Sequence, residues 1–189
     1  MTIALITGPA VEPLSLAEVK AHLRVDHDHE DALITDTLNA ARQYCEFASG
    51  HKFITQAWRQ YETCLPADRL VCLSLQPVQS VSAVTVFDID GNPTVLAAQD
   101  IELIRGANPS LLRLSNTIDT ALGRNGIEID LIVGMGDLGV DVPDTIKRAI
   151  LLLVAHWYEF RGAVSPADQP VSIPPGFEAL MSPFKGARL

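Results

Sequence analysis

The segment that comes closest to a chemical motif is Gly134–Gly139 (GMGDLG), which matches the GxGxxG glycine pattern of dinucleotide-binding sites. In such sites the glycines let the backbone approach a pyrophosphate, and the third glycine packs inside the following helix. Here Val140–Val142 separate the third glycine from the proline that opens the next helix. The acidic partner expected about 20 positions later would be Glu159, inside that helix instead of at the end of a second strand. We therefore favour a flexible glycine loop between sheet and helix, and keep a small nucleotide-binding enzyme using this loop as the alternative.

A second group with chemical potential is the acidic stretch Asp26–Asp31, which contains His27 and His29. A calcium loop needs glycine at its sixth position and glutamate at its twelfth, but Asp31 and Thr37 stand there. Zinc would need ligands from several elements, and no second His/Cys group with suitable spacing is present. The stretch is typical of the acid-rich start of a helix. The sequence predicts no metal site and no cofactor.

His156 is the remaining candidate for acid–base chemistry, but it lies between Ala155 and Trp157 in an apolar segment and no GxSxG elbow accompanies it. We predict that its imidazole packs in the core or at a subunit contact, with Glu159 as a neighbour on the same helical face. The sequence therefore predicts no catalytic residue and no enzyme activity.

Composition and charge limit the remaining classes of function. The chain has 189 residues, 48% of them hydrophobic and 20% charged, which is typical of a folded globular protein. A formal net charge of -9 disfavours a DNA-binding regulator, because binding by counterion release needs a positive surface. The longest apolar run, Ala149–Ala155, is far shorter than the roughly 20 residues of a membrane-spanning helix. The amino terminus lacks the basic residues of a secretory signal, so we expect synthesis in the host cytoplasm.

Three cysteines, Cys45, Cys64 and Cys72, are odd in number and show no CxxC spacing. This argues against both a disulfide framework and a zinc site. We expect reduced, mostly buried thiols.

Three helices are predicted to form the core. Ser15 and Glu18 have the spacing of a capping box, which starts a short helix over 16–23. Apolar residues at spacings of three and four predict a helix from Glu30 to Ser49, closed by Gly50. A third helix is expected over 142–161, with proline in its first turn. The predicted buried stripes are Leu33, Ile34, Leu38, Ala41, Tyr44, Cys45 and Ala48, and Ile146, Ala149, Ile150, Leu153, Val154, Trp157 and Phe160.

Between the second and third helices the chain is rich in β-branched residues and turn signals. The Asp90–Asn92 turn predicts a hairpin, and strands joined by short turns without helices predict an antiparallel sheet. The candidate strands are Ile54–Tyr61, Leu70–Leu75, Val81–Asp88, Leu111–Leu114 and Ile127–Val133.

The fold class predicted from these elements is α+β: a helical core with an inserted antiparallel β element, a short C-terminal helix over 176–181 and an extended tail. The whole chain is assigned to one domain, with N-terminal helices over 1–50, the β-rich insertion over 54–133, the long core helix over 142–161 and a C-terminal extension over 162–189. The basic tail 184–189 is expected to need a partner for its order.

Three segments together resemble the head-tail connector (adaptor) family of tailed phages and gene transfer agents. They are Glu12–Asp26 (EPLSLAEVKAHLRVD), the helix Val142–Arg161, and Pro174–Leu180 (PPGFEAL). The match is closest to the longer connectors, which carry a β-rich insertion before the long helix.

This resemblance implies a structural component of the virion at the head–tail interface of a phage, a prophage particle or a gene transfer agent. It implies a homo-oligomeric ring, usually of twelve copies, that binds the portal protein and the stopper or tail-completion proteins. DNA would pass through the ring as cargo without sequence-specific binding, and no membrane is involved. The positions expected at subunit or partner contacts are His156, Trp157, Arg161, Phe184, Lys185 and Arg188.

Overall fold

The computed structural model describes residues 2–119, 123–160 and 173–185. The chain forms two compact units, a sheet unit (Met1–Ala10 with Thr55–Met135) and a helical unit (Val11–Ile54 with Gly136–Leu189). The assignment of all 189 residues to one domain stays a prediction. Among the described residues, no helix combines the length and the apolar character that crossing a bilayer requires.

The helical unit begins with α1 (Leu16–Leu23), whose bounds agree with the prediction. The Ser15 hydroxyl accepts a hydrogen bond from the Glu18 amide at 3.3 Å, and the Glu18 carboxylate accepts one from the Ser15 amide at 2.7 Å. The capping box is therefore confirmed. Arg24 ends the helix in the left-handed conformation with φ of 58°.

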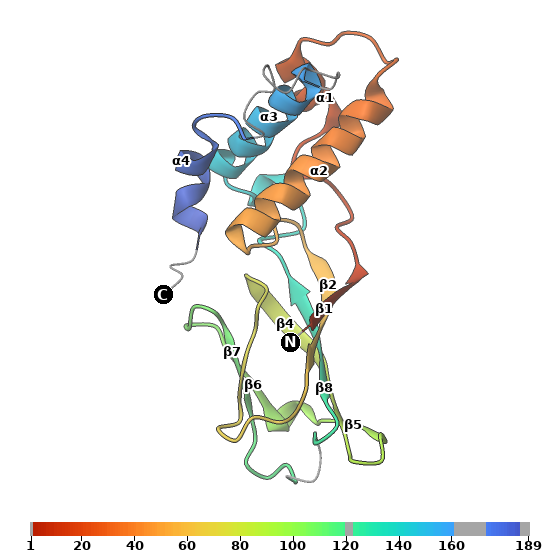
Figure 1. Ribbon diagram of the computed structural model, residues 1–189, viewed down its shortest axis with the longest axis vertical. Coiled ribbons are helices and arrows are strands. Elements are labelled where there is room, and N and C mark those ends of the chain that lie inside the picture. Colours follow the sequence, from red (N-terminus) through yellow and green to blue (C-terminus); the bar gives the residue numbers. More distant parts are fainter. Residues whose placement is uncertain (1, 120–122, 161–172, 186–189) are drawn as a thin grey trace, which may run out of the picture. The chain divides into compact units, whose positions relative to one another are not determined.

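The two long helices are α2 (Asp31–Ser49) and α3 (Asp144–Glu159), which pack along each other (Figure 1). Gly50 closes α2 with φ of 74° and donates its amide to the Glu46 carbonyl, as expected. Pro143 lies one position before α3 and caps it, instead of standing in the first turn.

The predicted buried stripes of α2 and α3 are each wrong at one position near a helix end. Leu33 is 41% exposed and Phe160 is 46% exposed, and each lies near a helix end. The short helix α4 (Phe177–Met181) follows Gly176 as predicted and continues into a 3-10 turn, Ser182–Phe184.

The sheet unit contains a five-stranded and a three-stranded sheet, in both of which every paired strand is antiparallel, as predicted. The larger sheet has the order β1 (Thr2–Thr7), β2 (Gln56–Glu62), β8 (Ile127–Val133), β4 (Val78–Phe87), β5 (Pro93–Val95). The smaller has the order β3 (Leu70–Cys72), β7 (Leu111–Leu114), β6 (Ile101–Ile104). The expected hairpin is present, since Asp88–Asn92 joins β4 to β5.

Every second residue of β8 contributes its side chain to the core of this unit. Ile127, Ile129, Leu131 and Val133 are at most 1% exposed, while the residues between them are half-buried. Val84 and Val86 of β4 and Leu112 and Leu114 of β7 belong to the same apolar cluster. This arrangement buries one face of the large sheet.

Three strands, β1, β5 and β6, are absent from the list of candidate strands, although the expected hairpin implied β5, and residues 1–10 belong to the sheet unit. The thiol prediction is also partly wrong. Cys45 is buried, and burial raises its pKa to about 12, but Cys64 and Cys72 are exposed.

Gln60 of β2 is fully buried. Each donor and acceptor group of its side-chain amide has a hydrogen-bond partner. Its Nε2 donates to the Cys72 carbonyl and to Glu62 Oε1, both at 2.8 Å. Its Oε1 accepts from the amide and the hydroxyl of Ser74, at 3.1 and 3.0 Å. The side chain therefore ties β2 to the segment that follows β3.

We predict that Gln60→Leu lowers the free energy of unfolding by about 1 to 3 kcal/mol, because backbone groups of Cys72 and Ser74 lose their partner. Urea denaturation measures the change. The exposed Gln99 provides the control, since Gln99→Leu should change stability by no more than about 0.5 kcal/mol. Equal midpoints for the two variants would contradict this role of Gln60.

Candidate subunit-contact site

An aromatic cluster joins α2, α3 and α4 in the helical unit. The ring of Tyr44 meets Trp157 edge-on with centroids 5.9 Å apart, and lies 5.7 Å from the ring of Phe177. Phe177 is fully buried, whereas Trp157 is half-buried. Aromatic pairs of this geometry stabilise beyond the area they bury. Trp157, predicted at a contact, thus packs on Tyr44, and Tyr44 also meets Phe177 of α4.

His156 lies beside this cluster on α3 and is half-buried. Its ring centroid is 5.0 Å from that of Phe160, which follows the helix and is 46% exposed. Glu159, the predicted neighbour, is exposed. The imidazole therefore lies at the border of the packed region, next to an apolar ring that reaches solvent.

The C-terminal residues expected at contacts lie on and after α4. Phe184 is half-buried at the end of the 3-10 turn, and Lys185 forms an ion pair with the Glu178 carboxylate. Arg161 and Arg188 lie outside the described residues. The structure thus brings His156, Trp157, Phe184 and Lys185 into one unit, and their contact with another subunit stays a prediction.

A buried ionic cluster lies in the same unit, and sequence reasoning missed it. The Glu46 side chain is 1% exposed and receives Arg42 Nη1 at 3.3 Å and Lys52 Nζ at 3.1 Å. Arg42 also binds Glu12 through Nε at 2.8 Å, and the amide of Phe53 donates to Glu46 Oε1. The sequence did carry a signal, because Arg42 and Glu46 directly follow stripe positions of α2 and are four residues apart.

Burial raises the pKa of the Glu12 carboxyl, and the nearby Arg42 guanidinium opposes that shift. A buried charge is tolerated when it is paired and hydrogen-bonded, which holds for each member of this cluster. We assign the cluster a structural role, since its charges are paired with one another.

Other residues of the chain occupy the space beside two glycines of the glycine loop. A Cβ on Gly136 would lie 2.3 Å from the Asp141 carboxylate, and one on Gly139 would lie 2.5 Å from the Pro13 carbonyl oxygen. The same carboxylate accepts the amide of Leu138 at 2.9 Å. Gly136 and Gly139 are therefore closely packed, and the flexibility expected of the loop stays a prediction. A loop amide that already binds a carboxylate is not presented to a phosphate.

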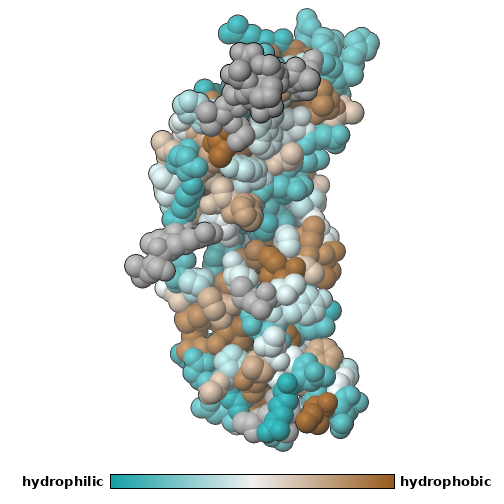
Figure 2. Space-filling view, in the orientation of Figure 1, coloured by the Kyte–Doolittle hydropathy of each residue, from teal (hydrophilic) through white to brown (hydrophobic). Residues whose placement is uncertain are grey.

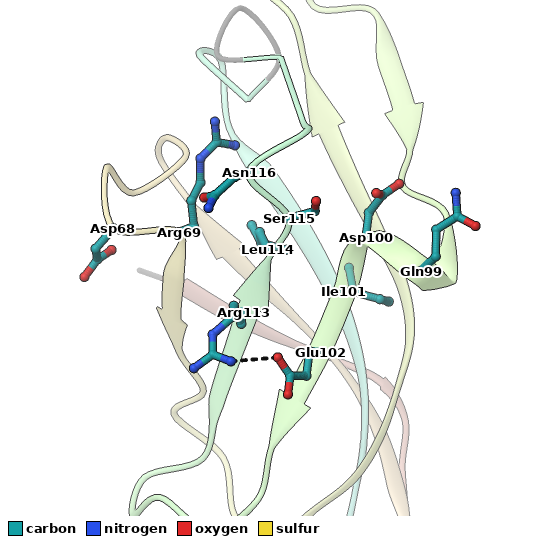
Figure 3. A pocket seen from close by; sticks show the side chains of 10 residues that line it. All are labelled: Asp68, Arg69, Gln99, Asp100, Ile101, Glu102, Arg113, Leu114, Ser115 and Asn116. Atoms are coloured by element: carbon teal, nitrogen blue, oxygen red, sulfur yellow. Dashed lines mark hydrogen bonds and ion pairs between the residues drawn. The ribbon is translucent and has the colours of Figure 1, made fainter.

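One pocket of about 420 Å³ lies in the sheet unit, and Figure 3 shows its lining side chains on the small sheet and the adjoining turns. Arg113 and Glu102 form an exposed ion pair across it at 2.8 Å. Charges of both signs alternate along the wall, which favours neither an anionic nor a cationic ligand. Among the described residues, no group of three His, Cys, Asp or Glu side chains is placed to hold a metal ion.

Large apolar side chains reach the surface of both units, and Figure 2 shows such patches in brown. In the sheet unit they are Ile3, Leu5, Ile6, Ile89 and Val95, and in the helical unit Val11, Leu33, Phe47, Leu138, Val140 and Phe160. Several of these lie on one strand, β1, and are contiguous in sequence.

Comparison with known proteins assigns the family. Residues 12–165 match the family model described as "Head completion protein". The chain belongs to the head completion protein family. The matched range includes α1, α2, α3 and every strand except β1, so the family assignment covers most of both units.

Solved structures show the same fold as this head completion protein. A chain in the neck of an empty gene transfer agent (GTA) particle, computed with C6 symmetry, is 25% identical with a TM-score of 0.82. A chain in the neck of the native GTA particle, computed with C12 symmetry, is 25% identical with a TM-score of 0.79. A chain from the virion of the native GTA particle is 24% identical with a TM-score of 0.81. Each match covers 100% of this chain and 97% of the other. No curated protein matches the sequence.

We predict that Phe177→Ala detaches α4 from this head completion protein's helix pair and lowers the free energy of unfolding by about 3 to 5 kcal/mol. Urea denaturation gives the stability, and hydrogen exchange of the amides of Phe177–Met181 reports detachment. Phe47, which is 83% exposed on α2, supplies the control, and Phe47→Ala should stay within about 0.5 kcal/mol of the original. Unchanged protection of α4 in Phe177→Ala would show that the ring is not its anchor.

Proposed function

We propose that this chain is a structural subunit of the junction between head and tail of a phage-like particle, and that it catalyses no reaction. Membership of the head completion protein family carries the proposal. The likeness over the full chain to a subunit of a GTA neck at 25% identity supports it. The particle belongs to a phage, a prophage or a gene transfer agent.

The subunits form a homo-oligomeric ring, which we propose to contain twelve copies. The similar chain in the native GTA neck comes from a structure computed with C12 symmetry, which supports this number. The apolar side chains exposed on both units are the kind of surface that subunit contacts cover. The ring binds the portal protein on one side and stopper or tail-completion proteins on the other.

DNA passes through the ring as cargo and is not bound by sequence. The formal net charge of -9 supports this, because a surface of the same sign as the phosphates resists adhesion of the duplex. A wall of basic residues would instead hold DNA by releasing its counterions.

The alternative, a small nucleotide-binding enzyme, has less support. Its glycine loop packs against Asp141 and Pro13, and the helix that should begin at the third glycine begins at Asp144. The Leu138 amide of this loop is already bound by the Asp141 carboxylate.

We predict that deleting the gene in its native host leaves filled heads without attached tails, and that electron microscopy of wild-type particles places this polypeptide in the neck. Heads are counted with and without tails, and the chain is located by labelled antibodies against it. Normal tailed particles without this polypeptide would refute the proposed function.

The C-terminal tail is proposed to reach the portal. We predict that Lys185→Ala combined with Arg188→Ala weakens portal attachment about tenfold or more, because the tail loses its positive charges, while the fold is retained. Binding of purified subunit to immobilised portal measures the effect.

Glu178→Ala is the matched control. It breaks the same ion pair with Lys185 but leaves the positive charge on the tail, and exposed pairs of this kind contribute at most about 1 kcal/mol. Portal attachment should therefore survive in the control. Undiminished attachment by the double variant, or by a subunit truncated after Leu180, would exclude the tail.

A further inference from the structure

Strand β1 presents an open edge of the large sheet. It pairs with β2 on one side, and in the described part of the chain no strand pairs with its other side. Ile3, Leu5 and Ile6 are 39%, 51% and 56% exposed. Such an edge offers unpaired backbone N–H and C=O groups together with apolar side chains.

The edge lacks the charges and prolines that often prevent strand addition, although its pairing with β2 shifts register between Leu5 and Thr7. Thr2–Thr7 (TIALIT) contains no charged residue and no proline, and the first charged side chain of the sequence is Glu12. Natural edge strands are usually protected by lysine, proline, or a covering loop. An unprotected apolar edge in a protein that must stay soluble indicates that another strand covers it.

A second open edge lies at the other end of the same sheet. β5 pairs only with Thr85–Phe87 of β4. The amide of Leu96, just after β5, donates a hydrogen bond to the Val84 carbonyl. The preceding stretch Val78–Ala83 (VQSVSA) pairs with no strand on that side among the described residues, although β6 contacts β4 and Arg105, just after β6, donates to the Gln79 carbonyl.

This stretch matches β1 in length and character. It also spans six positions, it carries no charge, and its exposed residues Ser80 and Ser82 are small. Register shifts after Val78 and Val81 bend the edge, which suits a short partner strand better than a long one.

We propose that β1 of one subunit pairs with the Val78–Ala83 edge of β4 in the next copy of this chain, so that the sheets of neighbouring subunits join. The proposal rests on the proposed ring function and names the contact between its subunits. The two surfaces differ, so the contact is heterologous and repeats from copy to copy until the ring closes.

The strand directions fit this pairing. β1 is antiparallel to β2, β2 to β8, and β8 to β4, so β1 and β4 of one sheet run in opposite directions. A rotation about an axis along the strands preserves strand direction. In a ring whose axis runs along the strands, the incoming β1 lies antiparallel to β4, and the joined sheet keeps the antiparallel pattern of each subunit.

Lysine on β1 tests the proposal. Ile3→Lys and Leu5→Lys each place a charge at the edge, and we expect each to raise the subunit concentration needed for ring formation about tenfold or more. Sedimentation velocity and electron microscopy measure assembly of the full-length protein. Ile89→Lys is the matched control, since Ile89 is 72% exposed in the β4–β5 turn of the same unit and touches neither edge.

A disulfide cross-link identifies the partner edge. In a background of Cys64→Ser and Cys72→Ser, one protein carries Leu5→Cys and a second, of different mass, carries Ser80→Cys. We expect mild oxidation of the mixture to join the two different proteins. Joining of Leu5→Cys to itself would reveal pairing of β1 with β1, and no cross-link in an assembled ring would exclude β1 from the contact; both results overturn the proposal.

The outcomes separate this proposal from the proposed function. Assembly of Ile3→Lys and Leu5→Lys as efficient as that of Ile89→Lys overturns the β1 contact and leaves the ring function standing. Circular dichroism and thermal melting establish that the lysine variants fold, and Ser80→Lys, placed on the other edge, should block assembly equally. A wild-type protein that neither assembles nor enters particles overturns the proposed function itself.

Discussion

The helical unit depends on the burial of one carboxylate, that of Glu46. Two cations and a backbone amide converge on it, and Arg42 extends the cluster to Glu12. Glu12 lies near the start and Phe53 near the end of the segment Val11–Ile54, so the cluster fixes both ends of that segment to α2. Removing one member of a buried ion pair typically costs about 3 to 5 kcal/mol, because the remaining charge loses its compensation.

Sequence reasoning succeeded where a local rule decides the structure. The limits of α1 follow from the capping box of Ser15 and Glu18, and those of β8 follow from a period of two between apolar and polar residues. It failed for β1 and β6, which are short apolar runs, although Gly8 and Pro9 follow the first and Gly106 to Pro109 follow the second as turn signals. β1 pairs with β2 and β6 pairs with β7, and no pattern within β1 or β6 predicts this pairing.

In the candidate site, too, local patterns predicted some features, and contacts with other parts of the chain decided the rest. The apolar period of α3 correctly brought Trp157 toward the packed side of the helix, but its partners Tyr44 and Phe177 come from two other helices. The tight turn at Gly136 and Gly139 exists because an Asp141 carboxylate and a Pro13 carbonyl occupy the space of a side chain. A glycine pattern alone cannot distinguish space filled by the protein from space kept for a ligand.

The charge of the chain limits which contacts can hold a ring. Subunits with a formal net charge of -9 repel one another, although at physiological salt such repulsion is screened beyond about 8 Å. Paired strands lie about 4.8 Å apart, and their hydrogen bonds and apolar contacts act at that short range. An uncharged edge is therefore the part of this acidic protein that can approach a neighbour with the least repulsion. The same charge favours solubility, so acidity is compatible with the proposed role of the bare β1 edge in a ring.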